Sequence, residues 1–329
     1  MKGPTTSLAR GGIGILISVV CLYLVLRDVD LGQTVGLLGT ARLPWLGLAL
    51  VGVSADLAFR ALRWQRLIAP IKPVPLGRLS GYMLVGYLAN NVLPARLGEL
   101  VRSHYLGDRE GISRSATQGT VVVERVVDTV VLVGIGAAAI LVLNVRGVVV
   151  SAILVGVALA VALAAHRLPG AARIAAFLGR WPRAKGIVLR LRDGLRVAAL
   201  PRTIAAAALL SVAAWSCTVV AVLAVGQALG IELTVGEGAL LAAGTNLATA
   251  IPSGPGYLGT FEYAGQTIAA AFGLPASRGL ALALLIHFLT LLVSSAGGGV
   301  AIVRLGWTRR TALPGATAAS AAGAADVQP

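Results

Sequence analysis

The chain has 329 residues, of which 57% are hydrophobic and 12% are charged, and its mean hydropathy is +0.85. A typical soluble domain has about 25% charged residues, so a chain with so few could not cover a water-exposed surface. These values exclude a soluble globular protein and predict an all-α integral membrane protein.

The positive charge lies between the apolar runs. Lysine and arginine outnumber aspartate and glutamate by 28 to 13, which gives a net charge of +15. This placement is typical of cytoplasmic loops under the positive-inside rule, so we expect no nucleic-acid partner. Cys21 and Cys217 lie inside apolar runs. We therefore expect neither a disulfide nor a metal site, and no cofactor.

Six apolar segments approach or exceed the length of about 20 residues that a membrane-spanning helix needs. The first lacks a small-residue cleavage site and is closed by Arg27 and Asp28, so we expect an uncleaved first span. Asp56 interrupts the second. The six segments are residues 12–27, 43–62, 118–143, 147–166, 203–229 and 280–304.

Two further apolar stretches, residues 77–106 and 236–273, contain helix-breaking residues near their middle. Proline removes a backbone donor and glycine loosens the backbone, so each stretch should form two half-helices. We expect two re-entrant hairpins that enter the membrane from opposite faces. The predicted break residues are Pro94, Gly98, Pro252, Gly254, Pro255 and Gly259.

The distribution of cations supports this topology. If the N-terminus is cytoplasmic and both hairpins are re-entrant, every cation-rich loop falls on the cytoplasmic side. These loops include residues 60–78 and residues 167–202, where nine cations face one acid, Asp193. Making only one hairpin a full span would place the later basic loops outside.

The sequence thus predicts one polytopic domain over residues 1–310 in the cytoplasmic membrane, with both termini cytoplasmic. Residues 167–202 are expected to form amphipathic helices on the inner surface or a solvated basic connector. Residues 311–329 are rich in Ala, Gly and Thr and are expected to form a disordered tail.

Charged residues inside the third apolar segment mark a candidate binding site. A charge costs about 2.5–3.5 kcal/mol at the centre of a bilayer, so it should face a partner or water. Glu124 and Asp128 share a helix face. In one interpretation Arg125 contacts a phosphate and these two carboxylates hold it in place. In the other, ion pairs lock this segment to a hairpin.

The first hairpin offers a site for an anionic head group. A half-helix that ends at Asn90 and Asn91 would free backbone groups inside the membrane, and a second would point its N-terminal amides there. Arg96 adds a guanidinium suited to a phosphate. A purely structural turn is the alternative. The remaining predicted binding residues here are Glu99 and Arg102.

The second hairpin has a similar outline, because Pro-x-x-Leu-Gly begins at Pro94 in one hairpin and at Pro255 in the other. Paired broken segments in two halves point to the central site of a transporter. The amides after Pro255 could hold an anion. His287, in the last span, is expected to be a core histidine satisfied by a backbone group, with a proton relay as the alternative. The predicted binding residues of this hairpin are Asn246, Ser253, Gly256 and Glu262.

Three ordered motifs, within residues 91–102, 123–128 and 251–262, resemble the lysylphosphatidylglycerol synthase transmembrane region, a flippase-like family. The resemblance covers about residues 10–306. In bifunctional members it implies movement of aminoacylated phosphatidylglycerol to the outer leaflet, while a separate soluble domain makes that lipid. No such domain follows here, so we expect a stand-alone member without synthase activity, whose cargo need not be an aminoacyl lipid.

The predicted function is translocation of an anionic phospholipid, an aminoacyl-phospholipid or a polyprenyl-phosphate-linked lipid, without catalysis. The expected partners are such a lipid and the bilayer, with homo-oligomerisation left open. One alternative is a membrane-embedded transferase that acts on lipid-linked substrates, with Glu99, Glu124 or Asp128 as base. Another is a membrane subunit that transports nothing.

Overall fold

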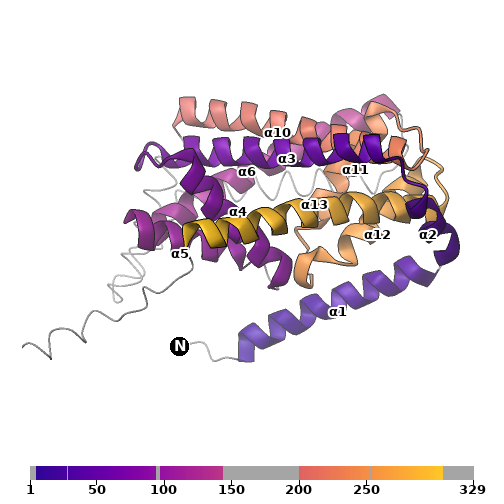
Figure 1. The fold of residues 1–329 in the computed structure, drawn as a ribbon, viewed down its shortest axis with the longest axis horizontal. Helices are drawn as coiled ribbons and strands as arrows, with labels where there is room; N and C mark the ends of the chain where they lie inside the picture. The colour runs from indigo at the N-terminus through magenta and orange to yellow at the C-terminus, as the bar shows by residue number, and fades with distance from the viewer. Residues whose placement is uncertain (1–4, 28, 94–96, 144–199, 252, 307–329) are drawn as a thin grey trace, which may run out of the picture.

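The computed structural model describes all residues except 1–4, 28, 94–96, 144–199, 252 and 307–329, and every regular element in the described part is a helix (Figure 1). Four of these helices are long and apolar enough to cross a membrane, which confirms the predicted class. They are α3 (Leu43–Ile68), α6 (Arg114–Leu143), α10 (Pro201–Ala228) and α13 (Ala276–Leu305).

These helices contain most of the predicted segments and extend beyond them. α3 continues past the expected end at residue 62, because Arg63 and Trp64 are buried by neighbouring helices and do not lie in a loop. The predicted first span falls within α1 (Thr5–Arg27), whose apolar part is the shorter Gly14–Arg27. The short helix α2 (Leu31–Gly39) follows it. The predicted segment 147–166, the surface helices of 167–199 and the tail lie outside the described residues.

Both stretches with predicted breaks are interrupted. The first consists of α4 (Leu76–Val92) and α5 (Gly98–Glu110), and the hydroxyl of Tyr82 in α4 donates to Glu110 Oε1 at 2.9 Å. The second consists of α11 (Val235–Ala248), the 3₁₀ turn η3 (Pro255–Tyr257) and α12 (Thr260–Ala271). In each case the two helices pack against each other, and we call them the first and second broken pairs.

Two predicted break glycines are required for different reasons. Gly98 allows α5 to approach α4, because a Cβ there would lie 1.8 Å from the carbonyl oxygen of Gly86. Its amide also donates to Asn90 Oδ1 at 2.8 Å. Gly259 has φ of +86°, in the left-handed region that favours glycine. Its amide donates to Glu262 Oε2, which fixes the start of α12.

The same succession of long, short, short and long helices occurs twice. α3, α4, α5 and α6 have 26, 17, 13 and 30 residues. α10, α11, α12 and α13 have 28, 14, 12 and 30 residues. We call these two sets the first and second repeats.

The two repeats pack against each other through equivalent, antiparallel contacts. The amide of Arg42, before α3, bonds to the carbonyl of Ala228 at the end of α10, whereas Arg63 near the other end of α3 bonds to Ser211. α4 packs against α13, and its counterpart α11 packs against α6. This arrangement relates the repeats by an approximate two-fold rotation.

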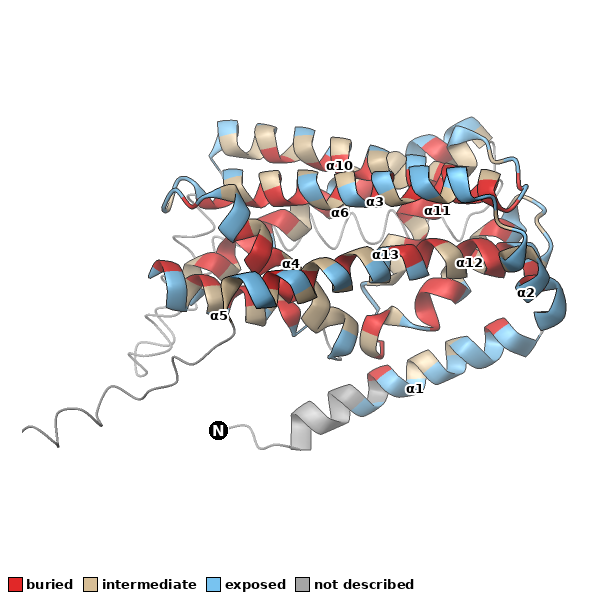
Figure 2. Ribbon diagram, in the orientation of Figure 1, coloured by how far each residue is buried: buried red, intermediate tan, exposed pale blue. Residues whose placement is uncertain are grey.

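Burial is concentrated where the helices of the two repeats face each other (Figure 2). Large apolar side chains point outward elsewhere, such as Leu141 and Val303, which are 81% and 79% exposed. α1 packs against α12, and most of the side chains that the structure describes in α1 are exposed. Exposed apolar faces around a polar centre suit a protein surrounded by lipid.

Candidate functional site

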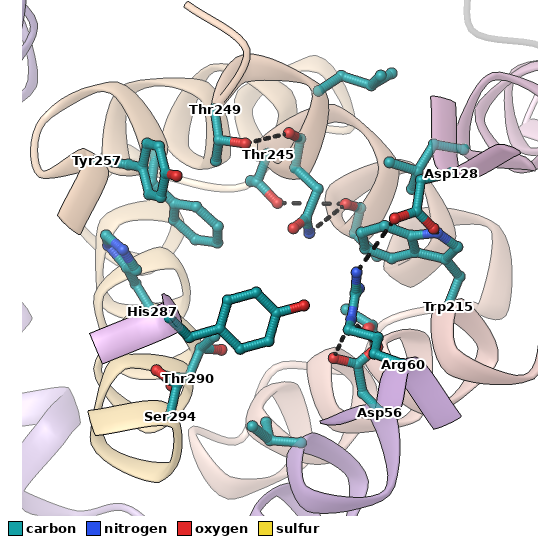
Figure 3. A pocket seen from close by; sticks show the side chains of 18 of the residues that line it. Asp56, Arg60, Asp128, Trp215, Thr245, Thr249, Tyr257, His287, Thr290 and Ser294 are labelled. Atoms are coloured by element: carbon teal, nitrogen blue, oxygen red, sulfur yellow. Dashed lines mark hydrogen bonds and ion pairs between the residues drawn. The ribbon is translucent and has the colours of Figure 1, made fainter. Parts of the chain in front are cut away.

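A cavity of about 230 Å³ lies between the two repeats and is lined by residues of α3, α4, α5, α6, α10, α11, η3, α12 and α13. Figure 3 shows that its two sides differ. Asp56, Arg60 and Asp128 form a charged wall together with Trp215, and neutral polar side chains including Thr290 and Ser294 face them.

Arg60 organises the charged wall. Its Nε lies 2.7 Å from Asp56 Oδ2, one helical turn away in α3, and its Nη1 lies 3.6 Å from Asp128 Oδ2 in α6. The guanidinium carbon lies 4.1 Å from the ring centroid of Trp215, whose indole nitrogen donates to Asp128 Oδ1 at 3.0 Å. Planar stacking and two carboxylates hold the guanidinium in one orientation.

Arg125 is the more accessible cation of the cavity, with 35% of its side chain exposed. Its Nε lies 3.0 Å from Glu99 Oε1, and its Nη2 lies 3.4 Å from Glu124 Oε1. The expectation that Glu124 and Asp128 together hold Arg125 is therefore only half right. Glu99, and not Asp128, is the second carboxylate that contacts Arg125, because α5 packs beside α6. Asp128 instead contacts Arg60 and Arg63 of α3.

Two further arginines lie behind the cavity. Arg63 is fully buried, contacts Asp128 Oδ1, lies 3.2 Å from Glu124 Oε1 and donates to Ser211 Oγ at 2.7 Å. Arg102 of α5 lies 3.2 Å from Glu124 Oε2. Such buried charges are tolerated because they are paired. The pairs Arg102–Glu124 and Arg125–Glu99 join α5 to α6, as the structural interpretation of these charges expected.

On the opposite wall, His287 of α13 pairs with Glu262 of α12. His287 Nδ1 lies 2.6 Å from Glu262 Oε1, and the ring stacks on Phe261 with centroids 4.3 Å apart. The prediction of a backbone partner for His287 is therefore wrong. A carboxylate from the second broken pair reaches the ring because α12 packs along α13.

Six of the predicted binding residues line the cavity: Asn90, Asn91, Glu99, Arg125, Asp128 and Asn246. Arg102, Glu124 and Glu262 lie behind it as partners of other charged or titratable groups. The C-terminal parts of α4 and α11, which carry these asparagines, therefore both line the cavity. Asn91 also donates to Ser294 and Ser295 of α13, each at 2.9 Å.

Ser253 and Gly256 do not line the cavity, and several amides around Pro255 that were expected to hold an anion have partners within the protein. The amides of Gly254, Tyr257 and Gly259 are already bonded, to Ser18 Oγ, Gly254 O and Glu262 Oε2. Arg96, Pro94 and Pro252 lie outside the described residues. In the described part of the chain, no group of three His, Cys, Asp or Glu side chains is placed to hold a metal ion.

Several residues that line the cavity were not predicted from the sequence. Asp56 was noted only as an interruption, and Arg60 was assigned to a loop. Their spacing of four residues, which allows an ion pair on one helix face, was the available signal. For cavity residues whose partners lie in the other repeat, no spacing in the sequence indicates the contact. The polar cavity residues that were not among the predicted binding residues are Asp56, Arg60, Tyr87, Thr129, Trp215, Thr218, Thr245, Thr249, Tyr257, His287, Thr290 and Ser294.

The apolar helices and the polar cavity between them define a multi-pass membrane protein with a central polar site. The chain belongs to the family described as the lysylphosphatidylglycerol synthase TM region, whose model matches residues 12–298, and this confirms the resemblance seen in the sequence.

The chain is also similar to a protein of Haloferax volcanii named glycosyltransferase AglD. The two are 27% identical over 343 aligned positions, which cover 91% of this chain and 55% of that protein. The chain therefore spans about half the length of this relative.

Proposed function

We propose that this protein moves a lipid with an anionic head group between the two leaflets of the cytoplasmic membrane. The observation that carries the proposal is the polar cavity between the repeats, reached by both broken pairs and surrounded by apolar helices. At about 230 Å³ it is smaller than sites that enclose drug-sized ligands, about 300–1,000 Å³. It suits a head group whose acyl or isoprenoid chains stay in the bilayer.

Arg125 is the proposed phosphate contact. Its side chain lines the cavity and is 35% exposed, whereas that of Arg60 is 10% exposed. A planar fork of donors suits two phosphate oxygens. The head group would share Arg125 with Glu99, and the amides of Asn90 and Asn246 offer further hydrogen bonds. Anionic phospholipids, aminoacyl-phospholipids and polyprenyl-phosphate-linked lipids all present such a group.

We further propose that both broken pairs are re-entrant and that the end of the bundle where α3 and α13 terminate is cytoplasmic. Positively charged side chains are concentrated there, as the positive-inside rule expects. The opposite end, between α10 and α11, carries Glu232 and Glu237. This orientation places both termini in the cytoplasm. The basic end carries Arg66, Lys72, Arg78, Arg109, Arg114, Arg202 and Arg304.

The antiparallel repeats support a mechanism of alternating access. Transporters built from inverted repeats expose a central site to each side in turn by movement of one repeat against the other. Here α3 and α10 face each other across the approximate two-fold axis, and the cavity lies between their repeats. The head group would enter from one leaflet and leave to the other.

We expect Arg125→Gln to slow leaflet exchange of anionic lipids by about 10–100-fold, because a hydrogen bond to a charged group contributes about 1.5–3 kcal/mol. Arg125 also pairs with Glu99 and Glu124, so thermal unfolding of the variant in detergent separates a loss of exchange from a loss of folding. Exchange would be measured in liposomes containing the purified protein, with fluorescently labelled phosphatidylglycerol and bleaching of the outer leaflet.

The matched control is Arg114→Gln, which removes a cation from the first turn of the same helix, where it pairs with the exposed Asp108. This variant should exchange lipid at the wild-type rate. Equal rates for Arg125→Gln and wild type would refute the assigned role of Arg125. No exchange by the wild-type protein with any of the three lipid classes would refute the proposed function.

A second candidate function follows from the relative that is named a glycosyltransferase. In that case the cavity would hold a lipid-phosphate acceptor while a sugar is transferred to it. The test is incubation with a lipid phosphate and nucleotide-sugar donors, followed by mass spectrometry of the lipids. A sugar-bearing product formed by the purified chain would favour the transferase over the translocator.

A further inference from the structure

Arg125 and His287 occupy equivalent positions in the two repeats. α6 begins at Arg114 and α13 at Ala276, both helices have 30 residues, and each of the two side chains is the twelfth. Each contacts a glutamate in the first turn of the preceding short helix. Glu99 opens α5 and lies 3.0 Å from Arg125, and Glu262 opens α12 and lies 2.6 Å from His287.

The two equivalent pairs differ in one chemical property. An arginine stays charged at every physiological pH, whereas histidine is the side chain that gains and loses a proton between about pH 5 and 8. The first repeat therefore presents a permanent cation to the cavity, and the second presents a cation that exists only after proton binding. Both side chains line the same cavity.

Glu262 holds the ring of His287 in place. Its Oε2 accepts from the amide of Gly259 at 2.7 Å, and its Oε1 contacts His287 Nδ1. Both contacts stabilise an ionised carboxylate. The residue His287 is 3% exposed, so the charge of the pair is poorly screened.

Among the residues that the structure describes, the other ionisable groups that face this cavity are fixed in pairs or are phenols. α3 contributes Asp56 and Arg60, and α6 contributes Arg125 and Asp128. The helix α2, which packs against α13, has no ionisable side chain, and those of α10, Arg202 and Cys217, do not line the cavity. The remaining ionisable groups on the cavity are Glu99 of α5, Tyr87 of α4 and Tyr257 of η3.

We propose that His287, held by Glu262, is a proton-binding site that couples lipid movement to a proton gradient, in symport with an anionic head group. This inference rests on the proposed function. Binding one anion adds one negative charge to the cavity, and binding one proton at His287 cancels it. The cavity therefore keeps the same charge when empty and when loaded, which lowers the electrostatic cost of reorienting the loaded site.

The proposed coupling predicts the direction of net lipid movement and the size of the lipid gradient that a pH gradient can produce. One proton that moves with one singly charged head group is electroneutral, so the membrane potential should not drive the process. A difference of one pH unit should concentrate the lipid about tenfold in the leaflet on the alkaline side, because a tenfold ratio corresponds to about 1.36 kcal/mol.

The experiment uses liposomes that contain the full chain and labelled phosphatidylglycerol, with a pH gradient of one unit and with potassium and valinomycin to hold the potential at zero. For the wild type we expect net accumulation of lipid on the alkaline side. His287→Asn and His287→Arg should both abolish this accumulation. His287→Arg, which gives the second repeat the permanent charge of the first, should also make the exchange rate independent of pH.

The matched control is His104→Asn. His104 pairs with Asp108 at 3.0 Å near the end of α5 and is not part of the cavity, so this variant should respond to the gradient as the wild type does. Wild-type exchange without any response to the gradient overturns the coupling and leaves the proposed function standing. A His287 variant that still accumulates lipid also overturns it. No wild-type exchange at any pH overturns both.

Discussion

Arg63→Ala is expected to prevent the protein from folding stably, although Arg63 does not line the cavity. Its guanidinium contacts two buried carboxylates, Asp128 and Glu124, and donates to Ser211. Removing one partner of a buried ion pair leaves uncompensated charge and costs about 3–5 kcal/mol. Lysine should not rescue the loss, because a single ammonium cannot reproduce the planar fork that reaches both carboxylates.

The measurement is thermal unfolding in detergent, followed by size-exclusion chromatography. The matched control is Arg66→Ala, three residues further along α3 and exposed, which should stay within about 0.5 kcal/mol of the wild type, as for most surface substitutions. Equal unfolding temperatures for the two variants would show that the buried network does not stabilise the fold.

Gly98→Ala is the second substitution with a large expected effect. The added methyl group would lie 1.8 Å from the carbonyl oxygen of Gly86 and 2.7 Å from Asn90 Oδ1, so α5 must move away from α4. Overpacking a tight contact costs about 1–3 kcal/mol, and here the obstructing atom belongs to the backbone and cannot rotate away. The displacement would also carry Glu99 away from Arg125, so we expect both lower stability and slower lipid exchange.

Gly77→Ala in α4 is the matched control, because a Cβ at that position meets nothing within 4 Å. It should leave stability and exchange unchanged or improve stability slightly, since alanine is the better helix former. A Gly98→Ala variant with wild-type stability would mean that the close approach of α4 and α5 is not needed.

The structural features that depend on local composition could be predicted from the sequence. Long apolar runs predict the four long helices, and proline and glycine residues predict the two breaks. Both predictions succeed because hydropathy and backbone restriction act within a few residues. Charges within an apolar segment correctly marked Glu124, Arg125 and Asp128 as residues that need partners. Asn90, Asn91 and Asn246 were predicted as binding residues of the two hairpins, and all three line the cavity.

Contacts between residues that are far apart in the sequence could not be predicted from local composition. The contact of Arg63 with Asp128 joins residues 65 positions apart, and that of His287 with Glu262 depends on how α12 lies on α13. Arg60 and Arg63 were assigned to a cytoplasmic loop because a cation-rich segment usually marks the end of a span. Here the cations face inward to carboxylates on another helix, which hydropathy alone cannot distinguish.

The equal lengths of α6 and α13, together with the antiparallel packing of the two repeats, have a consequence for the origin of the chain. Two similar halves in opposite orientation can arise when a gene encoding one half is duplicated and fused, provided that the ancestral half inserted into the membrane in both directions and paired with itself. Such an ancestor had identical residues at the positions of Arg125 and His287. The present difference between Arg125 and His287 would then have arisen after the fusion, because the two positions can differ only when one chain contains both halves.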